Sequence, residues 1–359
     1  MMDKQKALAM IEALSNAPGV SGFEDEAVQA LRRYSEGLGT IREDALRNLY
    51  VTPEAQSAHL PLVQLDAHSD EVGYLVKALR PNGTLDFITL GRMGASNIPA
   101  HRVLVRNTLG QYIPGIIAGK PPHFMTEAEK QRVPDICDMV IDVGASSDQE
   151  LREEYRIAIA APVVPETAFV YRPDYDIMIG KAFDNRLGCA GILAVLRELA
   201  GQNLKVRIAG AFAAQEEVGL RGATITAQEL KPDIAIVFEG SPADDTIAES
   251  YAVQTALKKG PMLRHFDVRM ITNPRFQRFA LDLARSKHIP VQEAVRTGGS
   301  TNAGVIHLTG KAVPVIVIGI PVRYIHTHYG IAAYRDFGHA VTLACEVIRH
   351  LDETVINGF

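Results

Sequence analysis

Hydrophobic residues recur along this chain in two patterns, and the change from one pattern to the other marks its organisation. Residues 4–15 and the segment EDEAVQALRRYSEGL carry apolar positions at helical spacing, which predicts two N-terminal helices. Ser21 and Glu24 form a capping-box pattern that predicts the start of the second helix. The apolar run LPLVQLDAHSDEVG, residues 60–73, then predicts a buried strand.

The middle of the chain has a different texture, with short β-rich runs separated by Gly, Pro and Asn turns. These runs are YLVKAL, FITLG, HRVLVRN, YIPGIIAG and DMVIDVG. Several short strands with turn signals between them are typical of a small barrel. We therefore expect residues 73–165 to form an inserted β-barrel-like domain, and residues 1–72 and 166–359 to form one discontinuous domain around it.

From about residue 168 onwards, strands and helices alternate. Continuous apolar runs such as KVRIAGAFAA, PDIAIVFEG and AVPVIVIG predict strands, whereas LGCAGILAVLRELA, RFQRFALDLARSKH and DFGHAVTLACEVIRHLDETV predict helices. Strands that are apolar throughout are buried on both faces, as in a parallel sheet covered by helices. The sequence thus predicts an α/β fold with a mostly parallel sheet.

Composition and charge narrow the classes of protein to consider. The chain has 359 residues, of which 47% are hydrophobic and 22% are charged, so it can build a large core. A net charge of -5 and the lack of a long Lys/Arg block give no reason to expect a nucleic-acid partner. No apolar run is long enough to span a bilayer, and charged residues in the first turns argue against a signal peptide. Three widely spaced cysteines suggest neither a disulfide framework nor a thiolate zinc site, which favours the cytoplasm.

Polar residues able to bind metal follow four of the predicted strands. They are His68 with Asp70, Glu216 with Glu217, Glu239, and His326, with His328 as a further candidate. Asp184 comes just before a predicted helix. Because ligands of open α/β sheets bind at the carboxyl ends of the strands, these side chains are expected to converge.

The adjacent acids Glu216 and Glu217 at the end of an apolar strand are the sharpest signal. Divalent cations would offset their mutual repulsion, and histidines with carboxylates suit zinc, cobalt or manganese. One acid can bind metal while the other acts as general base towards a water. His68 and Asp70 share a strand face, so we expect His68 to bind metal and Asp70 to orient its imidazole.

Each of these residues also has an ordinary interpretation. A single acid at a strand end is usually a solvated surface residue or a helix cap, and Asp184 alone could be an N-cap. A single histidine is more often hydrogen-bonded or exposed than a ligand. Chance placement of an acid or a histidine after four different strands is much harder to accept.

Six motifs, read together and in order, resemble the tetrahedral (TET-type) dinuclear metallo-aminopeptidases. Members of that family are often named glutamyl aminopeptidase, and some were labelled endoglucanase. The motifs are APGVSGFE (17–24), LDAHSDEVG (65–73), GKAFDNRLG (180–188), QEEVGLRGA (215–223), GGSTNAG (298–304) and PVRYIHTH (321–328). The resemblance implies a zinc-peptidase-like catalytic domain interrupted by a small β domain that mediates dimerisation, with dimers assembling to a dodecamer.

The resemblance also implies a role for each candidate residue at a pair of divalent metal ions. Asp184 resembles the carboxylate that bridges the two ions, and Glu216 resembles the general base. His68 and Glu239 resemble the other ligands of one ion, Glu217 and His326 those of the second ion, and Asp70 the residue that orients His68.

The chain departs from the family pattern at three positions. Glu239 stands where the family usually has Asp, and Asn302 stands where the family usually has Asp in a Thr-Asp-Ala motif. After His326 the chain continues Thr327-His328, where relatives often place an acid a few residues further on, so His328 is a candidate for lining the substrate pocket.

The expected function is metal-dependent hydrolysis of the N-terminal residue from short peptides by a cytoplasmic homo-oligomer, with no nucleic-acid or membrane partner. One alternative is a glycoside hydrolase that uses paired carboxylates. That alternative leaves the histidines unused, and the chain has no Trp for stacking on sugars. A second alternative is a catalytically silent scaffold that keeps the fold, against which the intact set of candidate residues argues.

Overall fold

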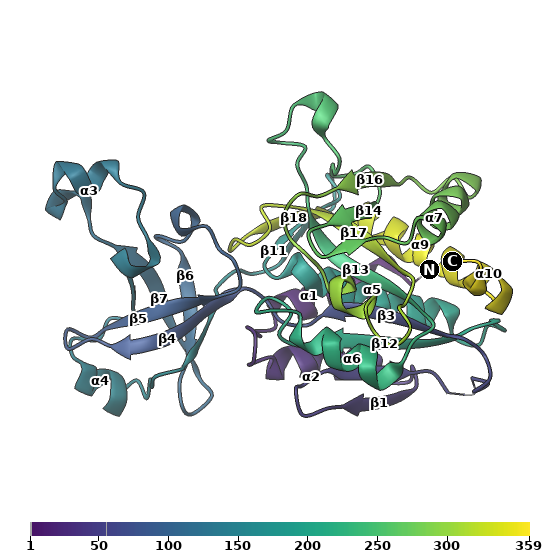
Figure 1. Ribbon diagram of the computed structural model, residues 1–359. Helices are drawn as coiled ribbons and strands as arrows, with labels where there is room; N and C mark the ends of the chain where they lie inside the picture. Colours follow the sequence, from purple (N-terminus) through teal and green to yellow (C-terminus); the bar gives the residue numbers. More distant parts are fainter. Residues whose placement is uncertain (1, 55) are drawn as a thin grey trace.

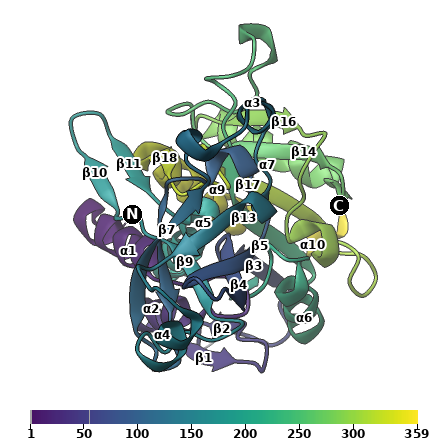
Figure 2. The same cartoon turned by 90° about the vertical axis from the view of Figure 1, so that its left-hand side faces the viewer.

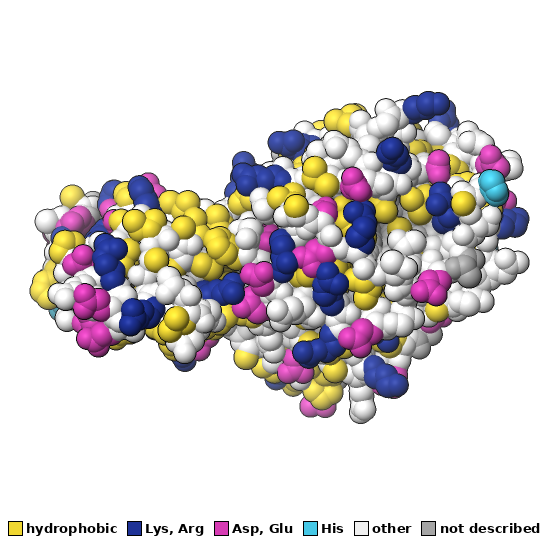
Figure 3. All heavy atoms as spheres, turned by 90° about the horizontal axis from the view of Figure 1, so that it is seen from below, with side chains coloured by type: hydrophobic (Ala, Val, Ile, Leu, Met, Phe, Trp, Pro, Cys, Tyr) yellow, Lys and Arg dark blue, Asp and Glu magenta, His cyan; other side chains and the backbone are white. Residues whose placement is uncertain are grey.

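The computed structural model describes residues 2–54 and 56–359, which form a large body and a smaller barrel beside it (Figure 1). The body contains a 12-stranded sheet, and the barrel closes on itself. Figure 3 shows the barrel projecting from the body, with hydrophobic side chains gathered on its surface near the junction. The expected α/β fold with a separate β-barrel is therefore confirmed.

The centre of the body's sheet is parallel, as its uninterrupted apolar strands predict. Strands β12 (Arg207–Ala213), β3 (Leu62–His68), β13 (Ile234–Pro242) and β17 (Val315–Arg323) lie side by side in that order and pair in parallel. Further strands, most of them in antiparallel pairs, extend both sides of this centre. These flanking strands are β1 (Thr40–Glu43), β2 (Leu49–Thr52), β10 (Val170–Arg172), β11 (Ile177–Gly180), β14 (Met262–Asp267), β15 (Met270–Ile271), β16 (Gln292–Val295) and β18 (Gly330–Ala333).

Helices cover both faces of this sheet. Along β13, Ile236 and Phe238 join one core with helix α5 (Phe183–Leu199), while Ala235 and Val237 join a second core with helix α6 (Arg221–Leu230). Side chains alternate between the faces of a strand, so each face needs its own cover. Figure 2 shows α6 on the opposite side of the sheet from α1 and α2. The remaining helices of the body are α1 (Lys4–Asn16), α2 (Asp25–Ser35), α7 (Pro274–Ser286), α8 (Ala303–Ile306), α9 (Tyr334–His350) and α10 (Glu353–Asn357).

The barrel is built from six strands in the closed order β4-β5-β8-β7-β6-β9. Closure leaves no free strand edge, and the inward side chains form a separate apolar core. The strands are β4 (Gly73–Leu79), β5 (Thr84–Leu90), β6 (Arg102–Arg106), β7 (Tyr112–Gly119), β8 (Met139–Asp142) and β9 (Pro162–Pro165). Short helices α3 (Glu127–Gln131) and α4 (Asp148–Glu153) lie between them.

The predicted capping box at the start of α2 is wrong. The N-cap residue is Glu24 itself, and it makes no capping hydrogen bond. Ser21 instead donates its hydroxyl hydrogen to Asp70 Oδ2 at 2.6 Å, and Glu24 Oε1 accepts the N–H of Gln215 at 3.1 Å. Both side chains are buried among partners far away in the sequence, which outweigh the local cap. Within the described residues, no helix has the length and apolarity needed to cross a membrane.

Candidate metal centre

The candidate residues converge at the carboxyl ends of the central parallel strands. His68 is the last residue of β3, and Glu216 and Glu217 follow β12. Glu239 lies within β13, and His326 lies in the loop after β17. Asp184 joins them from the first turn of α5. Residues that are up to 258 positions apart, His68 and His326, thus meet at one edge of the sheet because four parallel strands end there.

The carboxylate of Asp184 lies between the two histidines. His68 Nε2 is 3.0 Å from Asp184 Oδ1, and His326 Nε2 is 3.2 Å from Asp184 Oδ2. One carboxylate therefore presents one oxygen to each histidine. This is the arrangement expected of an acid shared between two cation positions, and the bridging role of Asp184 stays a prediction that this geometry favours.

The other candidate acids complete two groups around this carboxylate. Ligand atoms of His68, Asp184 and Glu239 all lie within 4.8 Å of one another, as do those of Asp184, Glu217 and His326. His326 Nε2 is 3.5 Å from Glu217 Oε1. A third such group joins His68 to Glu216 and Glu217. Asp184 is common to the first two groups, so the residues could hold two cations side by side.

The electrostatics of the cluster fit positive ions. Burial raises the pKa of Glu217 and of Glu239 well above the usual carboxyl range, and the neighbouring Asp184 raises both further. Glu217 Oε1 is buried and accepts no hydrogen bond from the part of the chain that the structure describes. Buried acids without compensating partners are costly, and bound cations would remove that cost. The residues present therefore fit a pair of divalent ions.

The two histidines respond to the same crowding of acids. Burial by itself would lower the pKa of His326, but Glu217 and Asp184 raise it to about 9. Burial by itself would raise the pKa of Asp184, but hydrogen bonds from His326 and His68 hold that pKa below the usual carboxyl range. Against the effect of burial, acids also raise the pKa of His68, so both histidines favour the protonated form in the absence of cations, and metal binding is expected to release protons.

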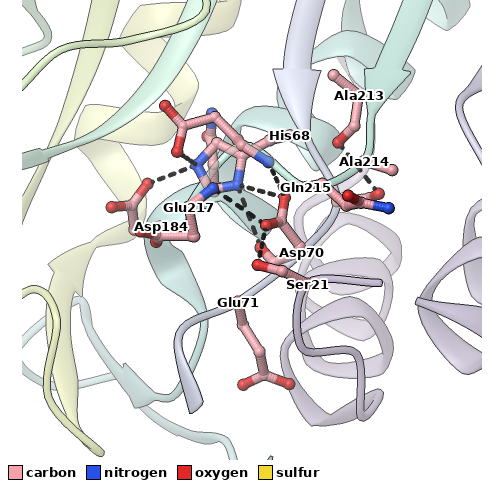
Figure 4. Close-up of polar contacts among 12 residues, drawn as sticks. Ser21, His68, Asp70, Glu71, Asp184, Ala213, Ala214, Gln215 and Glu217 are labelled. Carbon is pink, nitrogen blue, oxygen red and sulfur yellow. Dashed lines mark hydrogen bonds and ion pairs between the residues drawn. The ribbon is translucent and has the colours of Figure 1, made fainter. Parts of the chain in front are cut away.

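Asp70 belongs to neither of the two groups that share Asp184, but it contacts the ring of His68. Figure 4 shows it between His68 and the backbone that leads to Glu217. Asp70 Oδ1 lies 3.4 Å from His68 Nδ1, and the backbone C=O of Asp70 lies 3.1 Å from that nitrogen. This nitrogen is the one that faces away from Asp184, so the position favours the orienting role of Asp70, which stays a prediction.

Several residues of the site carry no local signal strong enough to predict their role. Ser21 bonds to Asp70, and Asn185 donates from Nδ2 to Glu239 Oε2 at 2.9 Å. Lys181 and Glu71 form a buried ion pair at 2.5 Å beneath the site. All four lie inside the motifs quoted above, so only the motif context could have drawn attention to them.

Two of the three departures from the family pattern lie outside the cluster. Asn302 is buried and donates to Asp66 Oδ1 at 2.7 Å, so it satisfies a buried acid of β3. His328, the candidate for lining the substrate pocket, is only 1% exposed and packs against the barrel instead. The expectation for His328 is therefore wrong, because its ring is enclosed at the junction of barrel and body. Glu239 remains within the group around His68.

The loops that carry these residues have unusual backbone conformations. Ala182, Gln215 and His326 have φ values of 56°, 55° and 59°, in the left-handed region that residues with a Cβ rarely adopt. Each lies within two residues of a candidate ligand or base, or is one itself. Such strain persists only where the surroundings fix the backbone, and it concentrates at functional sites.

Comparisons with known proteins agree with this geometry. The sequence profile described as M42 glutamyl aminopeptidase matches residues 48–343. The chain is 33% identical over 354 residues to a glutamyl aminopeptidase of Lactococcus lactis subsp. cremoris, covering 98% of this chain and 97% of the relative.

Solved structures extend the similarity to three dimensions. A TET aminopeptidase from a marine sediment Thaumarchaeota archaeon superposes with a TM-score of 0.95 at 34% identity, covering 99% of both chains. A TET1 peptidase of Pyrococcus horikoshii, described as assembling into a tetrahedron or an octahedral shell, has a TM-score of 0.85 at 24% identity. The alignment covers 96% of this chain and 100% of that one, and at this identity it shows the fold alone.

Proposed function

The chain belongs to the M42 glutamyl aminopeptidase family and is a metal-dependent aminopeptidase, and on that premise we propose how its residues perform the hydrolysis. Two divalent ions, zinc, cobalt or manganese, would be held by His68 with Glu239 and by Glu217 with His326. Asp184 would be shared between them. Glu216 would take the proton of the attacking water and return it to the leaving amine nitrogen. Short peptides with a free N-terminus would be the substrates.

One observation carries this proposal. The two oxygens of Asp184 face His68 and His326 at 3.0 and 3.2 Å, and each histidine has its own further acid within ligand distance. A single-ion site needs no such shared carboxylate. The arrangement therefore favours two ions over one.

The reaction depends on a proton carrier close to these positions. Bound divalent ions would lower the pKa of a water towards about 7 and polarise the scissile carbonyl. Glu216 Oε2 lies 3.9 Å from His68 Nε2, so its carboxylate faces the shared side of the cluster. Burial, more than any neighbouring charge, raises the pKa of Glu216 to about 7. A carboxyl group that titrates near neutrality can take a proton from the attacking water and return it to the leaving amine nitrogen.

The alternatives lack support in the described residues. A glycoside hydrolase with two catalytic carboxylates would give His68 and His326 no role, yet both lie against acids of the cluster. A silent scaffold would have no reason to bury Glu217 and Glu239, for which the described residues provide no ion pair with a Lys or Arg side chain. Neither alternative accounts for the shared Asp184.

We further propose that the barrel, residues 73–165, mediates dimerisation and that dimers assemble to a dodecamer. Large apolar side chains project from the barrel at Phe124 and Val133, which are both 72% exposed, and from a body loop at Ile247 and Tyr251, which are 82% and 92% exposed. Large apolar side chains as exposed as these are candidates for burial between copies. The body would then comprise residues 1–72 and 166–359.

Three free cysteines support the cytoplasm as the proposed location.

Chelation and reconstitution test the proposal. The purified protein would be treated with EDTA and then assayed with aminoacyl-p-nitroanilides of acidic, basic and apolar residues after addition of zinc, cobalt or manganese. We expect loss of activity and its recovery with at least one metal, while aryl glycosides remain uncleaved. Full activity after chelation, or no turnover with any metal, would contradict the proposal.

A further inference from the structure

His328 connects the metal centre to the barrel. It lies two residues after His326 in the loop between β17 and β18, which extends from the body towards the barrel (Figure 1). His328 Nδ1 is 2.8 Å from Nδ1 of His101, a residue just before β6, and the ring centroids are 4.2 Å apart. Thr167, two residues after β9, donates its hydroxyl hydrogen to the C=O of His328 at 2.8 Å.

These contacts fix both the side chain and the backbone of His328. Of the two facing nitrogens, one must donate and the other must accept, so each ring sets the orientation of the other. Tyr74 of β4 stacks on the His328 ring, with centroids 5.9 Å apart. The three partners come from the barrel or from the chain that leaves it, so a buried histidine of the body is enclosed by barrel residues.

The loop needs an anchor of this kind. Tyr324 and His326 both have left-handed φ values, 61° and 59°, which residues with a Cβ rarely adopt. Inside the loop, the Thr327 hydroxyl lies 2.8 Å from the C=O of Tyr324. That contact closes the turn but does not place it relative to the rest of the molecule. The contacts of His328 do so.

The two histidines of the centre are supported differently. A metal-binding histidine usually donates its second ring N–H to a carboxylate or a carbonyl, which sets the ring orientation. His68 Nδ1 has such partners in Asp70. For His326, no protein hydrogen bond to Nδ1 is found among residues 2–54 and 56–359, and its polar contacts are with the candidate ligands Asp184 and Glu217. With no hydrogen bond to Nδ1, the direction of the His326 ring depends on where the loop backbone places it.

We propose that His328 is a positioning residue. Its contacts with His101 and Thr167 hold the loop so that His326 points at the cation position that Glu217 also faces. The barrel then contributes to metal affinity on one side of the centre only. This inference rests on the two-ion centre proposed above and extends it to residues that make no contact with an ion.

The test replaces His101, the barrel partner of His328, and leaves the sequence of the loop between β17 and β18 unchanged. His101→Ala removes the partner of His328, whereas His101→Asn keeps a donor or acceptor where Nδ1 stood. The matched control is His123→Ala, an exposed barrel histidine for which the described structure shows no polar contact. Zinc binding to the EDTA-stripped proteins would be measured by titration calorimetry, and the cobalt absorption spectrum and the melting temperature would be recorded.

We expect His101→Ala to weaken one of two zinc sites by about 10-fold or more, in the range seen when support of a ligand is lost, and to leave the other within about twofold. The cobalt spectrum should change for that site alone, and His101→Asn should restore most of the affinity. His123→Ala should match the wild type. Equal weakening of both sites, or unchanged binding by folded His101→Ala, would overturn the inference alone. A wild type without two-site binding would overturn the proposed two-ion centre and this inference with it.

Discussion

Asp70 holds the backbone of Glu216: the N–H of Glu216 donates to Asp70 Oδ1 at 2.9 Å. The other oxygen of Asp70 accepts the N–H of Glu217 at 3.1 Å and the Ser21 hydroxyl at 2.6 Å. Because the same carboxylate also faces His68 Nδ1, one buried acid of the loop after β3 positions residues from two different strands. The proton carrier and a predicted ligand are thereby fixed relative to each other.

Asp70→Asn should weaken this positioning. An amide has one acceptor oxygen, so at least one of the two backbone N–H groups loses its partner, and the attraction for His68 weakens. We expect kcat and zinc affinity to fall by about 10-fold to 100-fold with little change in KM. Steady-state kinetics and titration calorimetry would check this. Ser21→Ala, which removes a single bond to Asp70, should have a smaller effect, and an Asp70→Asn protein with wild-type kinetics would refute the positioning role.

Glu216→Gln should remove proton transfer while keeping the cluster. Gln has nearly the same shape but cannot take a proton at neutral pH, so we expect kcat to fall by roughly 10²-fold to 10⁴-fold. Zinc stoichiometry should stay at the wild-type value, because Glu216 lies outside the two groups that share Asp184. Activity assays and metal analysis on the same preparation would check both parts. Near-normal turnover, or loss of a metal ion, would assign Glu216 a different role.

Glu24 should make stability depend on pH. Burial, followed by repulsion from Asp70, raises its pKa to about 7, against about 4.3 in an unfolded chain. Between these values the folded protein holds a proton that the unfolded chain has lost, so stability falls as the pH rises from about 4 to 7. Glu24→Gln keeps an acceptor for the N–H groups of Gly22 and Gln215 but carries no charge.

We therefore expect Glu24→Gln to be more stable than the wild type at pH 8, by up to about 3 kcal/mol, with the difference shrinking towards pH 4.5. Melting temperatures across this range, recorded in EDTA so that metal binding adds no pH dependence, would check it. A difference that is the same at every pH would show that Glu24 is already ionised at low pH in the folded protein.

Removing only one partner of the Lys181–Glu71 ion pair should lower the stability of the fold. Both side chains are buried, and Glu71 Oε1 also accepts the N–H of Gly19 at 3.1 Å. Lys181→Met leaves a buried carboxylate with Arg186 as its nearest cation, at 3.9 Å, and should destabilise the fold by about 3 kcal/mol. Adding Glu71→Gln removes that charge and should recover at least half of the loss. Thermal unfolding of both variants checks this, and a double variant no better than the single one would count against it.

Much of the centre was predictable because parallel strands end at one edge. His68 ends an apolar strand, Glu217 and His326 follow one, and Glu239 lies near the carboxyl end of another, and strand polarity alone brings such positions together. Asp184 needed the resemblance to a known family, since a residue before a helix is equally well an N-cap. The closed barrel was likewise visible as short strands between turn residues.

The supporting contacts could not be predicted, because they join residues whose spacing carries no period. Ser21 and Glu24 have the spacing of a capping box, yet each bonds to a partner at least 49 positions away. Nothing around His101 predicts a contact with His328, 227 positions later. Local spacing predicts local bonds, whereas these side chains satisfy buried polar groups that only the assembled fold creates.

Anomalous diffraction at the cobalt edge from reconstituted crystals tests the central claim most directly. The account predicts two cobalt peaks per subunit on either side of the Asp184 carboxylate, one beside His68 and Glu239 and the other beside Glu217 and His326. A single peak, or peaks remote from Asp184, would contradict it.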